Sequence, residues 1–129
     1  MKTLTFLMLA LIGSLAIAKA EISDENMRGL QARAAEKIEI EVLKASRLPL
    51  PGGAKHKVEG KVTKVTESAS GLKVGDKIVI RYHTSMAPGS YPNKVEKGKR
   101  YKAYLRLDPK RDDKTYEDVA GRGTFMAVE

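Results

Sequence analysis

The sequence predicts an all-β protein, a small five-stranded OB-like barrel. Five short runs alternate apolar and polar residues at period two, which is the pattern of half-buried strands. Stretches rich in Gly, Pro, Ser and charged residues separate these runs. Closure into a barrel removes the edges that an open five-stranded sheet would expose. An SH3-like barrel or a small sandwich is the alternative topology.

The first twenty residues have the composition of a bacterial-type signal peptide. Lys2 gives a positive start, residues 4–18 are almost entirely apolar, and Ala18-Lys19-Ala20 fits a small-x-small cleavage site. We expect cleavage after Ala20 and a periplasmic or secreted protein. The alternative is an uncleaved anchor, but the run is shorter than the roughly 20 residues of a membrane span. With no cysteine in the chain, a lipoprotein anchor and disulfides are both excluded.

Residues 21–36 form a polar segment between the signal peptide and the barrel. Its few apolar residues recur at helical spacing, and Ser23 or Asp24 is a suitable N-cap. Gly29 weakens a helix at this position. A short N-terminal helix and a loose tail both fit this pattern.

The barrel domain is expected to span residues 37–129 and to begin with a strand at 37–45. In this strand β-branched residues alternate with Glu39 and Glu41. Residues 47–54 then contain two prolines and two glycines. They predict an open loop rather than a tight hairpin.

The second strand is predicted at residues 56–66. Val58 and Val62 share one face, but Val65 is out of phase with them by one residue. Such a phase shift within a strand indicates a β-bulge.

The third and fourth strands are predicted at residues 76–84 and 99–107, with the long segment 85–98 between them. This segment contains two prolines and is expected to be a functional or partly ordered loop. The side chains expected to face the core are Ile78, Ile80 and Tyr82 in the third strand, and Tyr101, Ala103, Leu105 and Leu107 in the fourth.

The last strand is predicted at residues 122–128, after a charged turn region. Phe125 and Ala127 are expected to share a face with Gly121 and Gly123. We expect these glycines to let the strand bend into the barrel, and a phosphate-binding loop is disfavoured because no helix is predicted after them.

Three motifs resemble those of exported OB-fold domains of the netrin-like and metalloproteinase-inhibitor type. They are V-x-G-x-V at residues 58–62, G-D-x-I-x-I at 75–80 and K-G-x-x-Y-x-x-Y-L at 97–105. The resemblance covers about half of the chain that follows the signal peptide and implies an OB fold. The cysteines that are typical of that family are absent here, so its protease inhibition is not implied.

The sequence predicts no catalytic site, no metal site and no cofactor. Nucleophilic catalysis is disfavoured because there is no cysteine, and no serine lies in a G-x-S-x-G setting. His56 and His83 lack the spacing and the accompanying ligands of a zinc site. An enzyme of unrecognised type remains a remote alternative.

The candidate ligand-binding residues are cations and aromatic residues on the outward face of two strands. They are Arg81 and His83 in the third strand, and Lys102, Tyr104 and Arg106 in the fourth. OB folds bind extended chains with such residues. A solvated outer face with no ligand is the alternative interpretation.

The chain carries a formal net charge of +8 and stays positive after Lys2 and Lys19 leave with the signal peptide. For an exported protein, this charge favours an envelope protein or an anionic polysaccharide as partner and disfavours nucleic acid. We therefore expect a non-enzymatic binding module without a transmembrane segment. The alternative is a structural or assembly subunit of an envelope complex, in which residues 21–36 fold on a partner.

Overall fold

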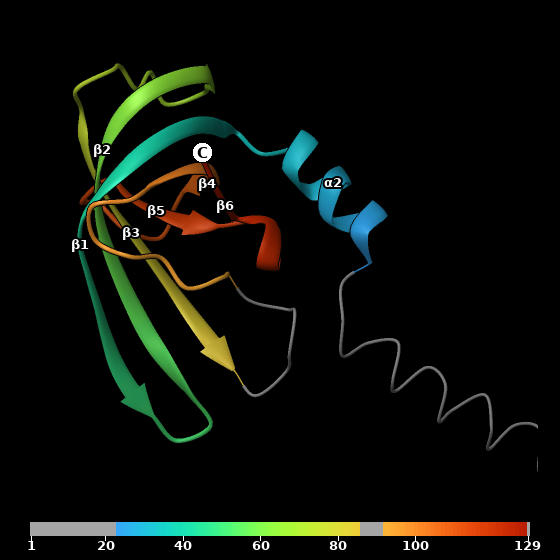
Figure 1. Cartoon of the computed structure of the whole chain (residues 1–129), viewed down its shortest axis with the longest axis vertical. Coiled ribbons are helices and arrows are strands. Elements are labelled where there is room, and N and C mark those ends of the chain that lie inside the picture. Colours follow the sequence, from blue (N-terminus) through green and yellow to red (C-terminus); the bar gives the residue numbers. More distant parts are fainter. Residues whose placement is uncertain (1–22, 86–91, 129) are drawn as a thin grey trace, which may run out of the picture.

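The computed structural model describes residues 23–85 and 92–128 of the chain. The predicted signal peptide, residues 1–20, lies outside the described residues. The elements in chain order are the helix α2 (Asp24–Ala32), the strands β1 (Glu36–Leu50), β2 (Gly53–Ser68), β3 (Lys77–Ser85), β4 (Arg100–Leu107) and β5 (Thr115–Asp118), the short helix η1 (Gly121–Gly123) and the strand β6 (Phe125–Ala127) (Figure 1).

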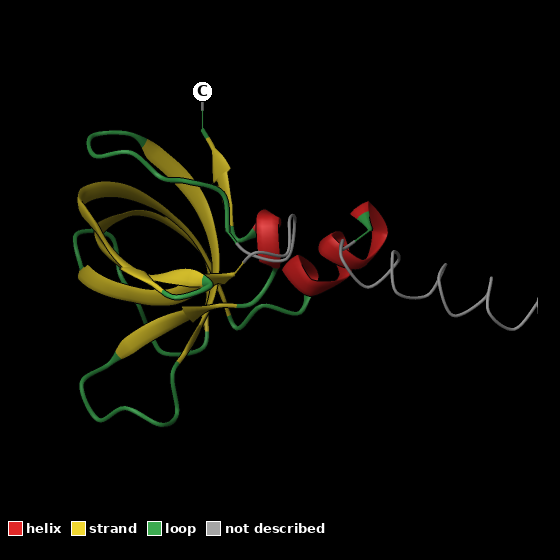
Figure 2. Ribbon diagram, turned by 90° about the horizontal axis from the view of Figure 1, so that it is seen from below, coloured by secondary structure: helices red, strands yellow, loops and turns green. Residues whose placement is uncertain are grey.

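Five of these strands close into a barrel. Their order is β1-β2-β3-β5-β4, and β1 pairs with β4 to complete the ring. β3 and β5 run parallel, whereas the other pairs of the ring are antiparallel. β6 pairs with the first part of β4, at Tyr101–Ala103, whereas β5 pairs with the last part of β4, at Leu105–Leu107. Figure 2 shows the strands curving around a common interior, with both helices on one side. The predicted OB-like barrel is confirmed.

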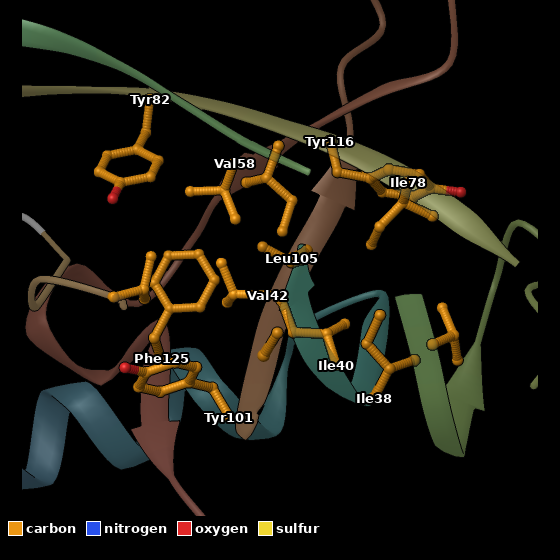
Figure 3. Close-up of a cluster of buried hydrophobic side chains, with 14 residues drawn as sticks. Ile38, Ile40, Val42, Val58, Ile78, Tyr82, Tyr101, Leu105, Tyr116 and Phe125 are labelled. Carbon is orange, nitrogen blue, oxygen red and sulfur yellow. The ribbon is translucent and has the colours of Figure 1, made fainter. Parts of the chain in front are cut away.

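The core forms where the period-two pattern of each strand points inward. Figure 3 shows side chains from β1 to β6 meeting in the barrel interior. Tyr82 and Tyr101 are buried as predicted, and their ring centroids lie 5.8 and 6.4 Å from that of Phe125. Leu107 was predicted to face the core but is 37% exposed, because it lies at the end of β4, beyond the buried part of that strand.

The predicted bulge in β2 is confirmed. Lys64 lies opposite Glu39 but Val62 lies opposite Ile40, so Thr63 is an extra residue on β2. This insertion accounts for the change of phase between Val62 and Val65, and it increases the local twist of the strand.

The prediction of an open loop at residues 47–54 is wrong. β1 continues to Leu50 and β2 begins at Gly53, so that only Pro51 and Gly52 connect them. Gly52 has a φ of +77° and follows a proline, which is the combination that a type II turn requires. The prolines and glycines therefore form a tight hairpin.

The outer half of this hairpin extends beyond the closed ring. β4 pairs with β1 from Glu36 to Glu41, and most of the rest of β1 has only β2 beside it. Pro49 lies on this edge, where the missing N–H group of a proline is tolerated. In Figure 1 the hairpin forms the lower end of the molecule, away from α2.

The prediction for the C-terminal region is wrong in three respects. β5, the strand that completes the ring, was not predicted. Gly121 and Gly123 belong to the 3-10 helix η1 rather than to a bent strand, and β6 begins only at Phe125. Phe125 and Ala127 were predicted to share a face, but Phe125 is buried whereas Ala127 is exposed.

The segment before the barrel contains a helix. Ser23 caps α2, because its Oγ accepts a hydrogen bond from the backbone N–H of Asn26 at 3.2 Å. The helix packs on η1, where the side-chain amide of Gln31 donates to the carbonyl of Gly123 at 2.8 Å. Asp24 also forms an ion pair with Arg122. Of the two predicted states, helix and tail, the structure therefore shows the helix.

The connection between β3 and β4 is only partly described, because residues 86–91 lie outside the described part. Pro92 and Val95 are buried, and the backbone N–H of Glu96 donates to the Tyr101 hydroxyl at 2.9 Å. Within residues 23–85 and 92–128, neither helix has the length and the apolar composition to cross a membrane.

Candidate functional site

Outward-facing residues of β1, β2 and β3 form rows across the barrel, since residues directly opposite each other share a face of the sheet. The rows, starting near the hairpin tip, are Leu48–Lys55–His83, Ser46–Lys57–Arg81, Lys44–Glu59–Val79 and Glu41–Lys61–Lys77.

Most of the charge in these rows is positive. We use the term basic face for Lys44, Lys55, Lys57, Lys61, Lys77, Arg81 and His83. The acidic side chains in the same rows are Glu41 and Glu59. Because β2 and β3 alternate in phase, cations of one strand lie directly beside cations of the other, as with Lys57 and Arg81.

The lysines and Arg81 of the basic face have no carboxylate within ion-pair distance among the described residues. Some other cations of the barrel are paired, such as Lys37, whose Nζ lies 2.9 Å from Glu67, whereas Lys64, Arg100 and Lys102 have no ion pair among the described residues either. Clustered cations without counter-charges produce a positive potential that attracts anions. The basic face is thus the part of this surface best suited to an anionic ligand.

Arg81 is the most constrained member of the basic face. It is half-buried, and its Nε is buried without a hydrogen-bond partner in the described part of the chain. The hollow beside it is bordered by both signs of charge, namely Lys55, His83 and Arg111, and the carboxylates of Asp108, Glu117 and Asp118. Burial raises the pKa of the Asp118 carboxyl. A buried N–H without a partner is costly to the fold.

β5 separates the five residues that the sequence singled out. Arg81 and His83 belong to the basic face, whereas Lys102, Tyr104 and Arg106 lie on β4, on the other side of β5. The two groups do not form one continuous surface across neighbouring strands.

The group on β4 has acidic neighbours. Lys102 lies opposite Glu39 on β1, and Arg106 forms an ion pair with Glu117 on β5. Tyr104 is half-buried. Lys102 faces Glu39 as Lys61 faces Glu41, so the difference between the two groups is the Arg106 ion pair and the larger number of cations on β2 and β3, which favour the basic face as the candidate site.

Sequence reasoning missed the cations of β2. Lys55, Lys57 and Lys61 occupy alternate positions in the outward phase, and Lys77 starts the neighbouring strand. Their period-two spacing was a usable signal. It becomes informative only when β2 is known to pair with β3, which places these lysines beside Arg81.

A second hollow, of about 960 Å³, lies on the inner side of the hairpin. His56 stacks on Tyr82 there, with ring centroids 4.7 Å apart, and its Nε2 lies 3.0 Å from the Thr84 hydroxyl. Burial, Arg47 and His83 hold the pKa of His56 below its usual value, and burial with Asp118 raises that of Tyr82 to about 12. The described residues contain no group of three potential metal ligands. The His56 and Tyr82 rings pack on each other, which favours a structural role.

Fold and surface together define the class of this protein as a small OB-like barrel with one strongly basic outer face. No family model matches the chain, and neither does any curated protein or solved structure.

Proposed function

We propose that this chain is an exported, non-enzymatic OB-like binding module that contacts an anionic partner in the cell envelope through the basic face. The observation that supports this proposal is the group of unpaired lysines around Arg81 on β2 and β3. OB folds commonly bind extended ligands across strands two and three. The candidate partners are an acidic polysaccharide, an acidic protein surface and anionic lipid headgroups.

The spacing of the cations suits an extended partner with repeated negative charges. Strands rise about 3.3 Å per residue, so outward positions on one strand repeat at roughly 7 Å. Lys55 and Lys57 follow this repeat on β2, Glu59 occupies the next outward position and Lys61 the one after it, and Arg81 and Lys77 lie beside Lys57 and Lys61 on β3. A chain laid along β2 would meet several cations at once, and Arg81 would supply planar, directed hydrogen bonds.

The alternative role as an assembly subunit, with residues 21–36 folding on a partner, has less support. α2 already packs on its own barrel through Gln31 and through the ion pair between Asp24 and Arg122.

The proposal can be tested by removing three charges from the basic face and three from elsewhere. The first variant is Lys57→Gln/Lys61→Gln/Arg81→Gln. The matched control is Lys64→Gln/Lys102→Gln/Lys110→Gln, which has the same net charge and changes exposed residues that are not members of the basic face. Binding to a sulfated polysaccharide and to polyglutamate is measured by titration over a range of salt concentrations.

We expect the basic-face variant to lose on the order of tenfold in affinity or more, which is about 1.4 kcal/mol. Its affinity should also depend less on salt, because fewer ion contacts are broken. The control should stay within about threefold of the original chain. Equal losses in both variants would show that only net charge matters, and they would contradict a dedicated face.

A further inference from the structure

The tip of the β1–β2 hairpin carries exposed apolar side chains. Leu48 is 59% exposed and Leu50 is 37% exposed, and Pro49 and Pro51 beside them are exposed as well. Single exposed apolar residues are normal on protein surfaces, but a group at the end of a projecting element indicates an interaction site.

The register of the hairpin fixes the direction in which the leucines point. Leu48 lies opposite Lys55 and shares the outward face of the sheet with the basic face. Leu50 lies opposite Gly53 in the same phase, and at the turn it also borders the hollow on the inner side of the hairpin. The turn at Pro51 and Gly52 holds this register, since a slip of one residue would move both leucines to the other face.

Cations follow the leucines directly along the hairpin. Lys55 is in the same row as Leu48, and Lys57 and Arg81 form the next row towards the barrel. None of the three has a carboxylate within ion-pair distance among the described residues. An apolar end followed by unpaired cations is the arrangement of segments that lie at the surface of an anionic bilayer.

We infer that the partner of the basic face is an anionic lipid surface, into which the hairpin tip inserts Leu48 and Leu50. This inference rests on the proposed function, because the same cations contact the headgroups. The leucines would enter the boundary between headgroups and acyl chains while Lys55 and Lys57 stay at headgroup level. Charge complementarity with the anionic headgroups and the projection of the tip beyond the closed ring both favour a bilayer as the occupant.

The test measures binding to vesicles and to a soluble polyanion in parallel. It uses the chain from residue 21 onward, which keeps every described element and lacks the apolar leader. Co-sedimentation is measured with vesicles of phosphatidylcholine alone and with vesicles of equal parts phosphatidylglycerol and phosphatidylcholine. The variant is Leu48→Ser/Leu50→Ser. Its matched control is Val74→Ser/Leu107→Ser, which removes two side chains that are 67% and 37% exposed and lie away from the tip.

We expect binding to the phosphatidylglycerol vesicles and little to phosphatidylcholine alone. The tip variant should lose on the order of tenfold in vesicle affinity or more, because two leucines no longer leave water. It should keep its affinity for polyglutamate, which also shows that it is folded. The Val74/Leu107 control should bind both probes as the original chain does.

Other outcomes separate the two proposals. Binding to polyglutamate without binding to vesicles would overturn the lipid inference and leave the proposed function in place. Vesicle binding that the tip variant retains in full would show that the leucines do not insert. Binding to neither probe would contradict the proposed function as well.

Discussion

Glu36 is a carboxylate that the barrel buries almost completely, with 1% of its surface exposed. Its oxygens accept hydrogen bonds from the Ser68 hydroxyl, from the Ser70 hydroxyl at 2.8 Å, and from the backbone N–H groups of Ala69 and Ser70 at 3.1 and 3.2 Å. The Ser70 hydroxyl also lies 2.7 Å from that of Tyr116. One side chain at the start of β1 thus holds the end of β2 and the turn that follows it.

We expect Glu36→Gln to destabilise the barrel by about 2 kcal/mol, because an amide N–H₂ group would replace an acceptor among donors. The measurement is urea unfolding followed by circular dichroism. Glu39→Gln is the control: Glu39 is on the outer face of the same strand, and its change should cost less than about 0.5 kcal/mol. A similar loss of unfolding free energy in both variants would show that the hydrogen bonds around Glu36 contribute no more to stability than Glu39 does on the outer face.

At the scale of elements, α2 and η1 depend on a close approach at Gly123. A Cβ at this position would overlap the side chain of Met27 and lie 2.8 Å from Nε2 of Gln31. Because α2 has no buried residue of its own, this contact, the hydrogen bond from Gln31 and the ion pair with Arg122 hold it on the barrel. The helix is therefore the element that is easiest to detach.

We expect Gly123→Ala to release α2 while the barrel stays folded. Hydrogen exchange of the amides of Asp24–Ala32 should then accelerate by roughly tenfold or more, with little change in β1 to β4. Gly29→Ala is a control for which we expect the reverse change in hydrogen exchange. Its Cβ would be 3.4 Å from the Arg33 guanidinium, an acceptable contact, and alanine should slow exchange by stabilising the helix by about 1 kcal/mol. Unchanged exchange in Gly123→Ala would contradict the packing of α2 on η1.

The elements that the sequence predicted are those with a long period-two pattern. β1 to β4 each have three or more inward residues in phase, and the change of phase at Val65 was enough to predict the bulge. β5 has only four residues, two of them acidic, and it is a strand because β3 and β4 lie on either side of it. Pairing between distant strands supplies that information, and local pattern does not.

The same limit applied to the candidate site. Arg81 and His83 were recognised from the outward phase of β3 alone. Their true neighbours, Lys55 and Lys57, follow from the register of β2 with β3. Lys102 and Arg106 were grouped with them because the insertion of β5 between β3 and β4 could not be derived from local spacing.

At the scale of the whole molecule, the basic face on β1 to β3 and the helix α2 on η1 lie at different places on the barrel. Lys57 and Arg81 lie directly opposite each other, and like charges in such a pair are destabilising. This pair therefore costs the fold some stability, which is what we expect if the surface is a functional site. The net charge of +8 makes this cost larger at low salt.

The substitution Lys57→Glu should show separately how the basic face affects the stability of the fold and how it affects binding. An acid opposite Arg81 replaces a repulsive pair with an attractive one, so the free energy of unfolding should rise by roughly 0.5–1 kcal/mol at low salt. High salt should reduce the gain by screening. Affinity for polyglutamate should fall in the same variant, because the substitution places a negative charge within the basic face. Urea unfolding and binding are both measured at low and high salt.

Lys64→Glu is the matched control, with the same change in net charge at an exposed position of β2 outside the basic face. Lys64 lies opposite Glu39, so the substitution should lower stability instead of raising it, and polyglutamate affinity should fall much less than in Lys57→Glu. If both variants gain stability and lose affinity equally, total charge controls both properties. If Lys57→Glu alone becomes more stable and binds less, the unfavourable charge cluster is what binding requires, and the basic face is a functional surface rather than a solvated one.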